Sequence, residues 1–147
     1  MRLDFFIVVI ALGVVSVSSH GKSYDSQCGP TKFRVNVENK GHPLDNRYEL
    51  VAVTSAGDKK LFTAEEGGWL HAACVITTKS EPVLLFQSYC GGSGCVEDKY
   101  GIVQAATLKV LVRPSAKNIG NSKQASNVLV KPVPYLPKFK GSFCCEN

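Results

Sequence analysis

The stretch TKFRVNVE at residues 31–38 decides the fold class, because large apolar side chains occupy every second position. Phe33, Val35 and Val37 fall on one side of an extended chain, and polar or charged residues fill the positions between them. An alternation of period two over eight residues is typical of a strand with one face buried and the other in water. The stretch therefore predicts a half-buried β-strand.

Six further segments carry strand signals and are separated by turn residues: 47–54, 59–63, 69–77, 82–89, 100–103 and 107–113. Residues 83–86 read VLLF, an unbroken apolar run that is typical of a strand covered on both faces. Residues 20–30 are polar, and we interpret them as a leader before the first strand. Seven short strands at close spacing predict an all-β fold, either a small antiparallel β-sandwich or a compact barrel.

The C-terminal part predicts one short helix and an extended tail. Asn121 and Ser122 are suited to cap a helix near residues 122–130, which ends before Pro132. Prolines at 132, 134 and 137 then impose an extended path on the chain up to its last cysteines.

The N-terminus has the three parts of a secretory signal: a charged start, an apolar stretch from Phe5 to Val17, and an exit of small residues ending at Ser19. The apolar stretch is shorter than the roughly 20 residues that a membrane-spanning helix needs. We therefore expect residues 1–19 to be a signal peptide and residues 20–147 to be one secreted domain without a membrane span, either extracellular or periplasmic.

All six cysteines follow that signal, and an even number of cysteines in an exported chain predicts disulfides. Three glycines between Cys90 and Cys95 let the backbone turn back, so we expect those two to pair. A vicinal bridge is strained. We therefore expect the neighbours Cys144 and Cys145 to reach separately to Cys28 and Cys74 and to tether the C-terminal tail.

The C-terminal third is basic. Residues 99–145 contain eight bases and no acid, whereas residues 28–98 contain seven bases and nine acids. If the eight bases share a surface, that surface favours encounters with an acidic protein or a polyanionic polymer. We do not expect nucleic acid as the partner, because aromatic residues do not alternate with the bases on one strand face. The alternative is that the lysines only keep the domain in solution.

Two chemical alternatives rest on the three histidines. Cleavage after Ser19 would make His20 the first residue, and its amine and ring could bind copper with His42 or His71 as the second histidine. Such an opening resembles the histidine-brace copper proteins, which include the lytic polysaccharide monooxygenases. A small secreted hydrolase is the other alternative, with His42 or His71 and a glutamate as an acid–base pair. The candidate glutamates are Glu65, Glu66 and Glu97.

We expect neither alternative to be the main role, because the chain has no Gly-x-Ser-x-Gly, HExxH or phosphate-cradling glycine loop. The sequence favours a non-enzymatic binding or inhibitory protein, acting as a monomer, with no cofactor and with a basic surface for an acidic partner. The expected contact residues are Trp69, the loop tip at 91–94, and four side chains of the C-terminal tail: Lys131, Tyr135, Lys138 and Lys140.

Overall fold

The structure is a computed structural model that describes residues 21–41, 45–64, 68–90, 99–115 and 119–136. The predicted signal peptide at residues 1–19 lies outside these ranges. Within them, no helix is long and apolar enough to cross a membrane.

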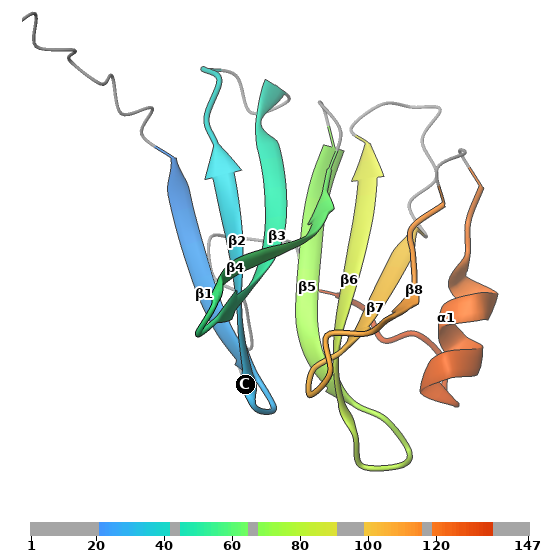
Figure 1. Cartoon of the computed structure of the whole chain (residues 1–147). Coiled ribbons are helices and arrows are strands. Elements are labelled where there is room, and N and C mark those ends of the chain that lie inside the picture. Colours follow the sequence, from blue (N-terminus) through green and yellow to red (C-terminus); the bar gives the residue numbers. More distant parts are fainter. Residues whose placement is uncertain (1–20, 42–44, 65–67, 91–98, 116–118, 137–147) are drawn as a thin grey trace, which may run out of the picture.

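In the described part of the chain, eight strands form two antiparallel four-stranded sheets that face each other (Figure 1). The N-terminal sheet contains β1 (Lys22–Cys28), β2 (Thr31–Glu38), β3 (Arg47–Thr54) and β4 (Gly57–Thr63), hydrogen-bonded in chain order. The C-terminal sheet contains β5 (Gly68–Ile76), β6 (Pro82–Cys90), β7 (Tyr100–Gln104) and β8 (Val110–Val112), again in chain order. This arrangement confirms the predicted all-β fold and its antiparallel sandwich form.

We did not predict β1 from the sequence, which is why we expected seven strands. β1 pairs with β2 along its whole length, from Lys22 opposite Val37 to Cys28 opposite Thr31. Its inward positions are Tyr24, Ser26 and Cys28, which carry too little apolar surface to stand out as a strand face. Backbone pairing to β2 holds this edge strand in place, so its residues do not need the apolar alternation that identified β2.

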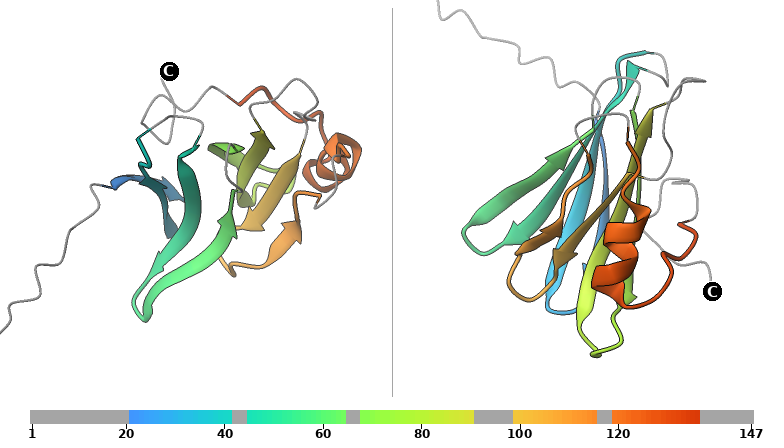
Figure 2. Two further views of the ribbon diagram at one scale, coloured as in Figure 1. Left: turned by 90° about the horizontal axis from the view of Figure 1, so that it is seen from above. Right: turned by 90° about the vertical axis from the view of Figure 1, so that its right-hand side faces the viewer.

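The main core lies between the two sheets. Phe33 and Val35 of β2 and Leu50 of β3 pack there with Leu84 and Phe86 of β6. A second core lies on the opposite face of the C-terminal sheet, where the helix α1 (Ser122–Leu129) covers it (Figure 2). Val83 and Leu85 point into that second core. The apolar run at 83–86 therefore belongs to a strand covered on both faces, as the sequence predicted.

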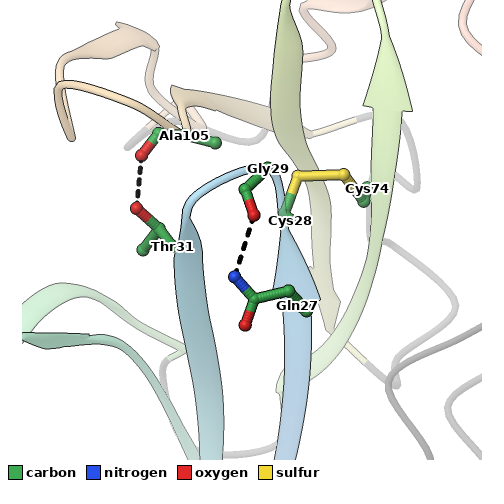
Figure 3. Close-up of a disulfide and its surroundings, with 6 residues drawn as sticks. All are labelled: Gln27, Cys28, Gly29, Thr31, Cys74 and Ala105. Carbon is green, nitrogen blue, oxygen red and sulfur yellow. Dashed lines mark hydrogen bonds between the residues drawn. A yellow bond between two sulfur atoms is a disulfide. The ribbon is translucent and has the colours of Figure 1, made fainter.

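One disulfide links the two sheets (Figure 3). Cys28, at the end of β1, bonds to Cys74 of β5, and the Cα atoms are 5.2 Å apart. The prediction that these two cysteines bond to Cys144 and Cys145 was wrong. Because β1 and β5 bring these two cysteines within the range of a disulfide, the two thiols bond to each other and are not available to Cys144 and Cys145. The side chains of Cys90, Cys95, Cys144 and Cys145 lie outside the described part of the chain, so the predicted Cys90–Cys95 pair stays a prediction.

The β1–β2 turn adds a second connection between the sheets at the same corner. Gly29 has a φ of +53° and precedes Pro30 in a two-residue turn, the glycine-first pattern of a type II′ hairpin. A Cβ at Gly29 would stand only 2.6 Å from Pro82, so the turn lies directly against the start of β6. The Thr31 hydroxyl donates a hydrogen bond to the Ala105 carbonyl, 2.5 Å away (Figure 3). The disulfide and this contact close one side of the sandwich.

Candidate functional site

The outer face of the N-terminal sheet is charged but balanced. The Asp25 carboxylate accepts hydrogen bonds from Arg34, 2.7 Å from its Nε, and forms an ion pair with Lys32. Arg34 also pairs with Asp58, and Lys60 pairs with Glu49. The hydrogen bonds from Arg34 and then Lys32 lower the pKa of Asp25 from 3.8 to about 2. Three cations and three anions therefore neutralise one another on this face, which leaves it without a strong preference for either sign of charge.

The C-terminal part of the chain is basic. From residue 99 to residue 136 the chain contains no acid. The bases described there are Lys99, Lys109, Arg113, Lys123 and Lys131. These bases do not all lie on one face. Lys99 precedes β7 and Arg113 follows β8, close to the backbone groups that Asn121 contacts. Lys131 instead lies just after the C-terminal end of α1, beside the end of β5.

Asn121 sets the position of α1. It was predicted to cap the helix, but its side chain makes no capping hydrogen bond. Its amide oxygen instead accepts a hydrogen bond from the Tyr100 N–H (2.7 Å), and its amide nitrogen donates to the carbonyls of Tyr100 (2.8 Å) and Arg113 (3.0 Å). The Asn121 side chain thus occupies the place of a strand neighbour at the ends of β7 and β8. It fixes the start of the helix to the sheet that the helix covers.

The chain after α1 forms a strap across the second core, and we define this strap as residues 131–136. Val133 is half-buried and Leu136 is buried against the C-terminal sheet, whereas Pro132, Pro134 and Tyr135 face outward. A spacing of three between the inward residues matches the three residues per turn of an extended polyproline path. The strap is therefore anchored at two points and presents a defined outer ridge.

Two of the predicted contact residues lie in this strap. Tyr135 is 84% exposed, which makes it the most exposed large apolar side chain that the structure describes. Lys131 is half-buried as a residue, and its ammonium donates a hydrogen bond to the Ile76 carbonyl at 2.7 Å. Its predicted role as a contact residue stays a prediction. The Trp69 side chain, the loop tip at 91–94, Lys138 and Lys140 lie outside the described residues.

The histidine alternatives gain no support from the described residues. His71 lies on β5 with only 4% of its surface exposed. On β5 it alternates with Leu70 and Ala72 of the main core, so it points toward the face that α1 covers. His20, His42 and the three candidate glutamates Glu65, Glu66 and Glu97 fall outside the described ranges. Within those ranges no group of three or more metal-ligating side chains comes together. Copper binding and hydrolysis stay predictions.

The sequence did not predict a hollow that opens between the edge strands β4 and β8. Its volume is about 110 Å³. Leu61 and Phe62 line it from β4, Phe86 and Val103 form its inner wall, and Val110, Arg113 and Pro114 line it from the β8 side. All but one of these side chains are apolar, and Arg113 is the exception. Their positions in the sequence gave no signal, because the residues come from four strands that only the sheet packing brings together.

No family of known proteins matches this chain, and no curated protein or solved structure is significantly similar to it.

Proposed function

We propose that this protein is a non-enzymatic, exported binding protein that engages an acidic protein through the outer side of α1 and the strap, which together we call the helix layer (residues 122–136). The observation that carries the proposal is that this layer has no acid and presents Tyr135 on an anchored support.

Charge supports the proposal. The helix layer carries Lys123 on the exposed side of α1 and Lys131 at the start of the strap, and residues 99–136 contain no carboxylate. The opposite face of the sandwich pairs its charges internally. The field of the molecule is therefore more positive on the helix side, which speeds encounters with an acidic partner and orients it there.

The strap supports a specific contact in addition to a general attraction. Tyrosine is enriched among the residues that dominate binding energy at interfaces. Burial of Val133 and Leu136 on either side of Tyr135, together with Pro132 and Pro134, holds the backbone in place before binding. A pre-ordered segment loses less conformational entropy when it binds, so more of the contact energy contributes to affinity.

A matched pair of charge reversals tests where the positive field lies. We expect Lys123→Glu to elute from a poly-glutamate matrix at clearly lower salt than wild type. Lys59→Glu makes the same charge change on an exposed residue of β4 in the N-terminal sheet, and we expect it to elute closer to wild type. Equal shifts for the two variants would contradict the proposal, because they would show that only net charge matters.

Capture of a partner from the fluid into which the protein is exported tests the specific contact. A partner of the proposed kind is acidic, is released by salt, and is lost with both Lys123→Glu and Tyr135→Ala while Lys59→Glu retains it. A partner that Tyr135→Ala binds as strongly as wild type would show that the helix layer is not the contact surface.

A further inference from the structure

We propose that the hollow between β4 and β8 is a binding site for a small amphipathic carboxylate, with the apolar chain between the sheets and the carboxylate on Arg113. This site is separate from the helix layer and does not depend on the function proposed above.

Both edge strands are irregular at the hollow. In the β3–β4 pair the register jumps so that Leu61 has no opposite residue, because Leu50 faces Phe62 and Val51 faces Lys60. In the β7–β8 pair Leu111 is left over in the same way. β-Bulges bend a strand and increase its twist. Figure 2 shows β4 and β8 on the same side of the molecule, away from β1 and β5, which the disulfide joins. Bends in β4 and β8 therefore shape the opening between these two strands.

The inner wall is firmly packed. Phe86 is 2% exposed, and a Cβ at Gly101 would stand 2.0 Å from its ring, so the ring rests on the glycine backbone of β7. The Phe62 ring lies 5.2 Å from the Phe86 ring, centroid to centroid, and tilts against it. The absence of a side chain at Gly101 thus lets Phe86 lie flat on β7 beside the opening. The resulting wall is aromatic and pre-formed.

The size of the hollow fits a short apolar group. Protein interiors leave few voids larger than a water molecule. An apolar cavity of about 150 Å³ is large enough to take up benzene. A hollow of about 110 Å³ that opens to solvent therefore accepts several carbons of an acyl chain, with the rest of the ligand extending to the surface.

The positive charge of Arg113 determines which head group of a ligand the hollow would favour. It is exposed, and within the described ranges its guanidinium has no ion pair or hydrogen bond. The other residues that line the hollow are uncharged, so an anion entering there meets no competing carboxylate. A guanidinium binds a carboxylate with two parallel hydrogen bonds. An acyl chain with a terminal carboxylate therefore satisfies both the apolar wall and the cation at its rim.

The test is an NMR titration of the full domain with decanoate, kept below its micelle concentration, and with decanol as the neutral analogue. We expect saturable shifts of the backbone signals of Leu61, Phe62, Val103, Val110 and Arg113. Arg113→Gln weakens decanoate binding about two- to fivefold, as the loss of one partly exposed charge pair implies, and leaves decanol binding unchanged. The control Lys123→Gln removes one charge from the helix layer and retains wild-type affinity for both probes.

Filling the hollow tests the apolar part of the site. Leu61→Trp and Val110→Trp, one from each edge strand, should abolish decanoate binding while the spectrum stays dispersed; if one variant fails to fold, the other supplies the result. Three outcomes overturn the proposal: no saturable shift at these residues, equal weakening by Arg113→Gln and Lys123→Gln, or broadening of the same signals with protein concentration alone, which would mark a second copy on this edge.

Discussion

At the scale of single residues, Asp25 shows how the outer face of the N-terminal sheet depends on charge. Its carboxylate receives hydrogen bonds from two cations of β2, which lower its pKa to about 2. A carboxyl group whose pKa is lower in the folded state than in the unfolded chain stabilises the fold at any pH above the unfolded value. That contribution decreases as the pH falls below about 3.8 and is fully lost only below about pH 2.

We therefore predict that Asp25→Asn is less stable than wild type at pH 6, with a difference that shrinks below pH 4 and vanishes only below about pH 2. The effect at pH 6 is modest, because about a third of the Asp25 side chain is exposed to solvent and surface ion pairs contribute less than about 1 kcal/mol. The measurement is the thermal midpoint of both proteins across this pH range. A difference that is constant from pH 6 to pH 2 would refute the role assigned to the ionised carboxylate.

At the scale of elements, the joint between α1 and the C-terminal sheet depends on one amide. Asn121→Ala removes three hydrogen bonds to the backbones of Tyr100 and Arg113. Leaving such partners unsatisfied costs about 1–3 kcal/mol. We predict a loss of that size in the free energy of unfolding, measured in urea.

Asn127→Ala is the matched control for this prediction, because Asn127 is exposed on the same helix. Alanine is a better helix former than asparagine, so this change should be neutral or slightly stabilising. If both variants unfold at the same urea concentration, Asn121 does not hold the helix to the sheet.

The elements also show what the sequence could and could not predict. The strong alternation of Phe33, Val35 and Val37 identified β2, and the run at 83–86 identified a strand covered on both faces. β1 was not predicted because its inward residues Tyr24, Ser26 and Cys28 carry too little apolar surface to give a clear alternation. The role of Asn121 escaped because a helix cap and a strand partner require the same residue type, and only the position of β7 decides between them.

Some features of the candidate sites could also be predicted from the sequence, whereas others could not. Tyr135 could be selected from the sequence because prolines around an aromatic residue indicate an extended, exposed segment. The hydrogen bond of Lys131 could not be predicted, because its acceptor, the Ile76 carbonyl, lies 55 residues away in the sequence. The hollow depends on two β-bulges and on Phe86 resting against Gly101, and bulges leave no periodic signal in the residues that form them.

At the scale of the whole molecule, the sandwich is closed by the disulfide between β1 and β5 and is open between β4 and β8. The disulfide closes a loop of 46 residues, for which the loss of chain entropy in the unfolded state corresponds to about 4 kcal/mol. We predict that Cys28→Ala with Cys74→Ala lowers the free energy of unfolding by about 2–5 kcal/mol.

Peptide mapping of the protein, purified without reducing agent, is the most direct test of this architecture. We predict that the peptide containing Cys28 is recovered covalently joined to the peptide containing Cys74. Recovery of either cysteine joined to Cys144 or Cys145, or of both as free thiols, would show that the two sheets are not held together as described.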